Sequence, residues 1–195
     1  MSDFSAAIML RAEHEAIALE HMEDNVFLIR LNANWLCRLS ANDEISIMNI
    51  EKYSKAVLDL SDRIPLMHVI HPEDHCFALC ILYKREVVCR FGVSYEFEMD
   101  EIDWDEFPEL PGAMGFGRFV KGEFENFKLF GFDDSDCAKM FATFTEVDMS
   151  DFRNKFESVR QLFSILGINE FSFVSHYYAS SDKERGETHF DVIKW

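Results

Sequence analysis

The stretch FALCILYKREVVCRFGVSYEFEM, residues 77–99, carries the strongest secondary-structure signal in the chain. From position 87 to position 99 every odd-numbered residue is apolar, while the even-numbered residues after Val88 are polar or glycine. This alternation predicts a β-strand with one face in the core and one face in water. Residues 77–83 form a second apolar run, and only Lys84, Arg85 and Glu86 separate the two runs. We therefore expect an antiparallel hairpin.

Helices and shorter strands are expected on both sides of this hairpin. Residues 2–24 and 42–63 carry apolar side chains at helical spacing behind polar capping residues, so each predicts a helix. A third helix is expected over residues 151–166, with Ser150 as its cap and Gly167 at its end. The remaining expected elements are a short helix over residues 133–143 and strands over residues 26–31, 116–120, 124–132, 171–178 and 188–195, the last two forming a hairpin.

Strands mixed with a few helices, and no regular βαβ alternation, predict an α+β fold. We expect a mainly antiparallel sheet with about three to four helices. The chain has 195 residues, of which 48% are hydrophobic, and it includes 20 phenylalanines. That supply of apolar surface is enough for one core, so a single compact domain over residues 1–195 is expected.

A dense acidic run follows directly on the predicted strand. Glu96 to Glu109 contains eight carboxylates and no basic residue, and the formal net charge of the chain is −17. The acidic surface is expected to be concentrated in residues 91–151. Aromatic and aliphatic residues interrupt the run, so it differs from a disordered acidic tail and can be held against a core. These residues are Phe97, Met99, Ile102, Trp104, Phe107 and Leu110.

Strong negative charge restricts the class of partner. A folded acidic protein is repelled by nucleic acids and by membrane surfaces, and it is attracted to basic surfaces. We therefore expect no direct binding of nucleic acid, no membrane association, and a basic protein partner. The predicted partner-binding residues are Glu96, Glu98, Asp100, Glu101, Asp103, Trp104, Asp105, Glu106 and Phe107. The simpler alternative is that the same run is only a solvated face.

This chemistry predicts a non-catalytic binding protein that blocks a nucleic-acid-handling protein, such as an inhibitor, an immunity protein or an antagonist of host defence. Carboxylates on alternate residues of a strand lie roughly 6.6–6.8 Å apart, close to the spacing of neighbouring phosphates. A narrower hypothesis is therefore that the surface mimics a nucleic-acid backbone.

Histidines give the alternative hypothesis, a small soluble enzyme. His68, His71 and His75 lie close together in the sequence, with Cys76 and Cys80 nearby. Such residues can bind zinc, but Pro72 divides the group and the spacing fits neither a helical pair nor a zinc knuckle. A turn that enters a strand is the favoured interpretation, and no metal or cofactor is expected. More distant candidates for an enzymatic site are His176 and His189.

The cysteines and the N-terminus indicate the compartment. Five cysteines form no dense disulfide framework, the N-terminus lacks the features of a signal peptide, and no apolar run approaches the ~20 residues that span a bilayer. A cytoplasmic protein with mostly buried thiols is therefore expected.

Overall fold

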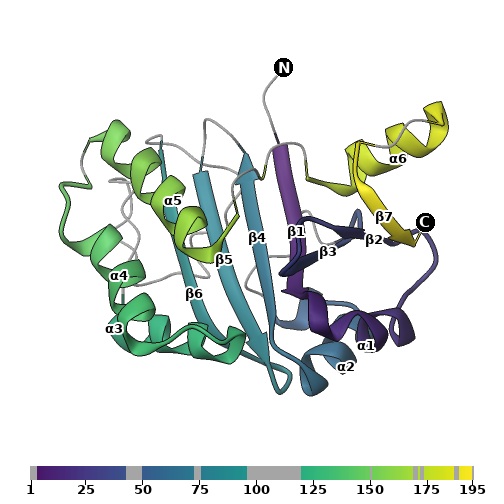
Figure 1. Ribbon diagram of the computed structural model, residues 1–195, viewed down its shortest axis with the longest axis horizontal. Helices are drawn as coiled ribbons and strands as arrows, with labels where there is room; N and C mark the ends of the chain where they lie inside the picture. Colours follow the sequence, from purple (N-terminus) through teal and green to yellow (C-terminus); the bar gives the residue numbers. More distant parts are fainter. Residues whose placement is uncertain are drawn as a thin grey trace.

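The computed structural model describes residues 4–42, 50–72, 76–95, 120–149, 151–168, 171, 174–186 and 189–194. In this part of the chain seven strands form one antiparallel sheet, in the order β6-β5-β4-β1-β3-β2-β7 (Figure 1). The strands are β1 (Phe4–Arg11), β2 (Phe27–Arg30), β3 (Trp35–Leu39), β4 (Leu66–Pro72), β5 (Cys76–Tyr83), β6 (Glu86–Ser94) and β7 (Asp191–Lys194). The expected α+β class with an antiparallel sheet is confirmed.

The described helices number six, more than the three to four expected. They are α1 (Glu15–Glu20), α2 (Lys55–Arg63), α3 (Lys121–Phe124), α4 (Asp134–Thr145), α5 (Phe152–Leu166) and α6 (His176–Arg185). Three short 3₁₀ helices join them: η1 (Ala12–His14), η3 (Ile50–Lys52) and η5 (Glu125–Phe130). Within the described ranges, no helix combines the length and the apolar character that crossing a membrane would require.

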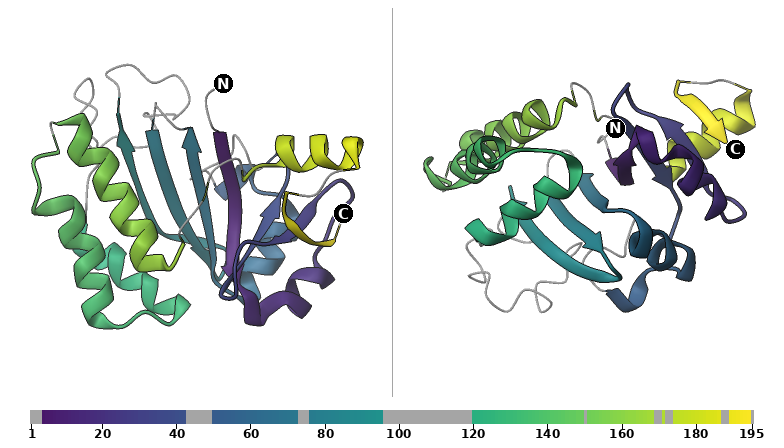
Figure 2. Two further views of the ribbon diagram at one scale, coloured as in Figure 1. Left: turned by 45° about the horizontal axis from the view of Figure 1, so that its top comes forward. Right: turned by 60° about the horizontal axis from the view of Figure 1, so that its bottom comes forward.

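Helices cover both faces of the sheet (Figures 1 and 2). On one face, which we call the α5 face, α3, α4 and α5 lie over the half formed by β4, β5 and β6, and α6 packs near β2. On the opposite face, which we call the α2 face, α1 and α2 cover a second apolar cluster. Because side chains alternate along each strand, they contribute to two apolar cores, one on each face of the sheet.

The hairpin of β5 and β6 confirms the predicted pairing of the two strands, while residues 96–99 of the expected second strand lie outside the described part of the chain. Phe77 pairs with Val93 and Leu79 pairs with Phe91 across the two strands. The turn is tighter than expected, because Tyr83 already pairs with Glu86 and only two residues lie between the strands. Those two residues, Lys84 and Arg85, have φ angles of 54° and 62°, as a two-residue turn that matches the twist of a hairpin requires.

The expected N-terminal helix over residues 2–24 is wrong in its first half. Residues of β1 pair with β3 on one side and with β4 on the other, so this strand lies in the middle of the sheet. Ala7 and Met9 enter the core of the α5 face, while Ile8 and Leu10 enter that of the α2 face. A strand buried on both faces has a continuous apolar run, and such a run does not distinguish strand from helix by periodicity.

The second expected helix is right only at its C-terminal end. α2 ends at Arg63 as expected, but it begins at Lys55, where the Ser54 side chain accepts a hydrogen bond from the Val57 N–H. Residues 43–49 lie outside the described part of the chain. The strand expected over residues 26–31 is confirmed as β2, whereas β3 was not predicted. β4 also replaces the turn expected around His68 and His71.

The C-terminal half contains two confirmed helices and one strand prediction, over residues 124–132, that is wrong. α4 and α5 are confirmed, with Asp151 as the cap of α5 and Gly167 in the left-handed conformation at its end; Ser150 is not among the described residues. Residues 124–130 are helical, the end of α3 followed by η5, and Phe124, Phe127 and Phe130 are all buried at three-residue spacing. Most of the strand expected over residues 116–120 lies outside the described ranges.

The expected C-terminal hairpin of residues 171–178 and 188–195 is also wrong. His176 begins α6, and β7 pairs with β2 from the N-terminal part of the chain. This pairing brings the last described strand into the same sheet as the first one.

Candidate functional site

The predicted partner-binding residues, Glu96 to Phe107, all lie outside the described part of the chain. The structure does describe the strand that leads into them. β6 is an edge of the described sheet, and Tyr95 is the last described residue before the acidic run. Tyr95 is buried, which, with a smaller effect of Cys76, raises the pKa of its hydroxyl well above the usual value. The residue that directly precedes the acidic run is therefore held in the core of the α5 face.

Aromatic rings surround Tyr95. Its ring centroid lies 6.1 Å from that of His71, 5.8 Å from that of Phe152 and 5.9 Å from that of Phe156. The Tyr95 hydroxyl also lies 3.3 Å from the Nε2 atom of His71. We call these four residues the aromatic cluster. One member, Phe152, remains 48% exposed at the start of α5, so the cluster reaches the protein surface.

Exposed carboxylates precede Phe152 in the connection between α4 and α5. Glu146, Asp148 and Asp151 are all exposed. The Asp151 side chain accepts a hydrogen bond from the Arg153 N–H, 2.8 Å away, and so caps α5. Neither Glu146 nor Asp151 forms an ion pair with any described residue. We call residues 146–149 with Asp151 and Phe152 the α4–α5 corner, and it combines exposed carboxylates with an exposed aromatic ring.

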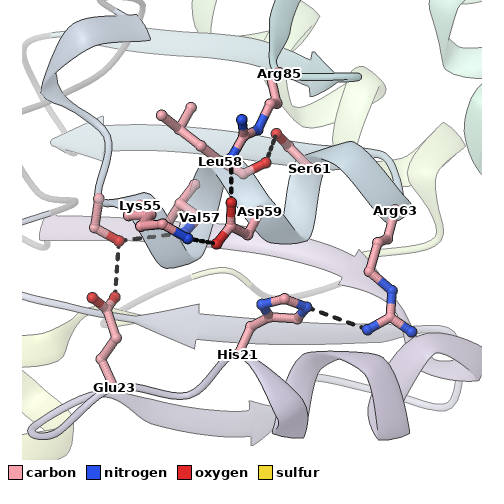
Figure 3. A network of polar contacts seen from close by, with 10 residues as sticks. His21, Glu23, Lys55, Val57, Leu58, Asp59, Ser61, Arg63 and Arg85 are labelled. Carbon is pink, nitrogen blue, oxygen red and sulfur yellow. Dashed lines mark hydrogen bonds and ion pairs between the residues drawn. The ribbon is translucent and has the colours of Figure 1, made fainter.

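Carboxylates on the α2 face form ion pairs with cations of the same chain, and Figure 3 shows those of Asp59. Glu20 pairs with Arg63, and Asp59 pairs with both Lys55 and Arg85. These hydrogen bonds to cations lower the pKa values of Glu20 and Asp59. The negative charge of this network is balanced within the chain, so it offers less to an external cation than the α4–α5 corner does.

Glu23 links this network to the sheet. It accepts a hydrogen bond from the Ser54 hydroxyl at 2.8 Å and another from the Arg38 guanidinium at 2.5 Å. Arg38 is only 2% exposed, so the pair joins a buried cation of β3 to the surface near α2. A buried charge needs such a partner to be tolerated.

The histidines proposed for the alternative enzymatic site do not converge. His68 and His71 belong to β4, but His68 points to the α2 face and His71 to the aromatic cluster on the α5 face. His75 lies outside the described residues. His176 contacts the Asn25 carbonyl at 3.1 Å, and His189 Nδ1 lies 2.9 Å from the buried Asp182 carboxylate.

His68 forms part of a buried polar cluster. The Tyr53 hydroxyl lies 2.8 Å from His68 Nδ1 and 3.1 Å from Cys80 Sγ. His68 and Cys80 are fully buried and Tyr53 is 5% exposed. In the described ranges, no group of three histidine, cysteine or acidic side chains is arranged to hold a metal ion. Burial raises the pKa values of the Cys37 and Cys89 thiols, which disfavours the nucleophilic thiolate at these positions.

Replacing Tyr53 by phenylalanine should test whether this cluster stabilises the fold. The variant keeps the ring but removes the hydroxyl that contacts His68 and Cys80. We expect the free energy of unfolding to fall by about 1–3 kcal/mol, since a buried polar group loses a hydrogen bond. Urea denaturation measures the change. Tyr83→Phe is the control, because the Tyr83 hydroxyl makes no hydrogen bond with a described residue. Equal effects of both variants would show that the cluster contributes nothing specific.

Phe152 is a candidate site residue that the sequence did not single out. Its spacing to Phe156 and Val159 places it on the apolar stripe of α5, yet its ring is half exposed. The sequence feature that could have indicated its exposure is its position in the first turn of a helix, directly after Asp148 and Asp151. The candidate site is therefore the α4–α5 corner together with Tyr95. Comparisons of the chain with protein-family models, with curated protein sequences and with solved structures found no match.

Proposed function

We propose that the protein is a non-catalytic acidic binding protein that blocks a basic partner by protein–protein contact. The partner class is a nuclease or another nucleic-acid-handling protein, and the role is that of an inhibitor, an immunity protein or a host-defence antagonist. The observation that carries the proposal is the exposed Phe152 ring, which follows the exposed carboxylate of Asp151 and packs against Tyr95, the residue that directly precedes the acidic run in the sequence.

Carboxylates and aromatic side chains contribute differently to such a contact. Carboxylates accelerate the encounter with a basic partner and set the register of binding. Aromatic side chains supply most of the contact energy once water is excluded, and they are enriched at binding hot spots. In this proposal the segment 96–107 and the α4–α5 corner both contact the partner, with Trp104, Phe107 and Phe152 as the aromatic anchors. Mimicry of a nucleic-acid backbone is the narrower form of the same proposal.

The alternative enzymatic function stays a prediction that these contacts do not favour. His68 is enclosed in the sheet, and His71 is packed among aromatic rings. The five buried thiols suit a reducing compartment, so the proposal places the protein in the cytoplasm.

Capture of the partner from a lysate of the native cells tests the proposal. The bait is the full chain, compared with the variant Glu98→Lys/Asp103→Lys/Asp105→Lys. The control is Asp24→Lys/Asp62→Lys/Glu184→Lys, which changes the net charge equally but at exposed positions away from the candidate site. Mass spectrometry identifies what is retained, and the activity of that protein on nucleic acid is then measured with each variant.

We expect the unmodified chain and the control to retain and inhibit a basic protein, and the first variant to lose both effects. Retention of the same protein by all three baits would show that the acidic run is a solvated face. A retained protein without affinity for nucleic acid would contradict the proposed partner class.

A further inference from the structure

A cleft of about 660 Å³ lies where the end of β1, the turn between β2 and β3, and the end of η5 meet. In Figure 1 this is the region where the green segment after α3 approaches the lower end of β1. The polar side chains that line it are Arg11, Glu13, Asn34 and Lys128. Its volume is in the range of small-molecule sites, and none of its lining residues belongs to the α4–α5 corner.

Arg11 is a cation of this cleft whose guanidinium is held by several contacts. Its Nε atom donates a hydrogen bond to the Phe130 carbonyl at 2.7 Å, and its Nη2 atom donates to the same oxygen. The guanidinium carbon lies 4.5 Å from the Trp35 ring centroid and 5.0 Å from that of Phe132. Two aromatic rings and a carbonyl therefore fix the orientation of the guanidinium before any ligand arrives.

The hydrogen bonds to Phe130 use only part of the donor capacity of Arg11. A guanidinium has five N–H donors, and three of them make no hydrogen bond with a described residue. Partial burial lowers the pKa of Arg11, but an arginine side chain stays charged at neutral pH. A structural clamp on η5 would need only the donors already engaged, so the remaining three are available to a ligand.

Two further donors line the same cleft. The Asn34 side-chain amide makes no hydrogen bond with a described residue. Lys128 pairs with Asp134, whose side chain is 90% exposed, and such an exposed pair is weak enough to be exchanged for a ligand. Glu13 contributes the opposing charge, and its negative field at Arg11 should reduce the affinity for an anion.

We propose that this cleft binds a small molecule through a carboxylate or phosphate group, held by Arg11 with Asn34 and Lys128. A planar guanidinium matches these two groups because both accept paired hydrogen bonds. The fixed orientation of Arg11 reduces the entropy lost on binding. The excess negative charge of the whole chain opposes any anion, but screening limits that effect to a range of about 8 Å at physiological salt.

Titration of the ¹⁵N-labelled full chain by NMR tests the proposal. The probes are inorganic phosphate in one arm and succinate in the other, with sodium chloride keeping the ionic strength constant. The reporters are the Arg11 Nε–H, the Asn34 side-chain amide and the indole N–H of Trp35. We expect saturable shifts of these signals in at least one arm, and the arm with the tighter binding identifies phosphate or carboxylate as the preferred group.

Two variants with opposite expected signs strengthen the test without altering Arg11, whose loss could unfold this region. Lys128→Ala should weaken binding about tenfold, as expected for the loss of a charge-assisted hydrogen bond. Glu13→Gln should tighten it, because an opposing charge is removed. Lys139→Ala on α4 is the control for net charge, and it should leave the affinity unchanged. Shifts that do not saturate, or equal losses with Lys128→Ala and Lys139→Ala, would overturn the proposal.

Discussion

Replacing Phe91 by alanine should lower the free energy of unfolding by about 3–5 kcal/mol, the range found when a buried aromatic side chain is truncated and leaves a cavity. Phe91 lies on β6 and is 1% exposed. Its ring centroid is 5.0 Å from that of Phe124, 5.2 Å from that of Phe144 and 5.7 Å from that of Phe77. The ring thus joins the hairpin to α3 and α4, and urea denaturation measures its contribution.

Phe152→Ala is the matched control, since it removes the same ring from a half-exposed position. We expect it to cost less than about 1 kcal/mol of stability. Because we place Phe152 on the partner surface, this variant should also speed dissociation from the partner while it leaves the fold intact. A loss of stability as large as that of Phe91→Ala would mean that the Phe152 ring serves the core and not the partner.

Reversing three charges in the acidic run should slow association with the captured partner by between about tenfold and a thousandfold at low salt. The variant is Glu98→Lys/Asp103→Lys/Asp105→Lys. Opposite charges steer two proteins together, so their removal lowers the association rate and also makes that rate less dependent on salt. Stopped-flow measurements at several ionic strengths give both quantities.

The control for this experiment is Asp24→Lys/Asp62→Lys/Glu184→Lys, which has the same net charge as the first variant. A modest and equal slowing by both variants would indicate that only the total charge matters. An unchanged rate with the first variant, at an unchanged melting temperature, would show that the binding surface lies elsewhere on the protein.

Local patterns were sufficient for the β5–β6 hairpin and for α5. In the hairpin, alternation over β6 and a short polar turn carried the information, because Cys89, Phe91 and Val93 all face the core of the α5 face. In α5, the apolar spacing and Gly167 predicted the helix and its end, since a left-handed residue at that position favours glycine. Both signals lie within about twenty residues of sequence, so no distant contact is needed to read them.

The sequence also determined the negative charge and the acidic run, because these depend on composition alone. It could not determine where an exposed aromatic ring would lie in the folded chain relative to exposed carboxylates. Phe152 has the spacing of a core residue. In the folded chain it contacts Tyr95 and Phe156, yet about half of its surface stays exposed. Likewise, the cations that neutralise Glu20 and Asp59 come from α2 and from the turn of the β5–β6 hairpin.

Only the tertiary structure decided that β1 is a strand and that His68 and His71 are separated. The apolar run of β1 fits a helix or a doubly buried strand, and pairing with β3 and β4 selected the strand. That choice set β4 as its neighbour, and side chains an odd number of residues apart on a strand point to opposite faces. His68 is therefore buried on the α2 face, whereas His71 lies partly buried among the aromatic rings of the α5 face. The physical reason is that periodicity shows only how apolar and polar side chains alternate along one segment. Which elements pack against each face of that segment depends on the neighbouring strands and the covering helices.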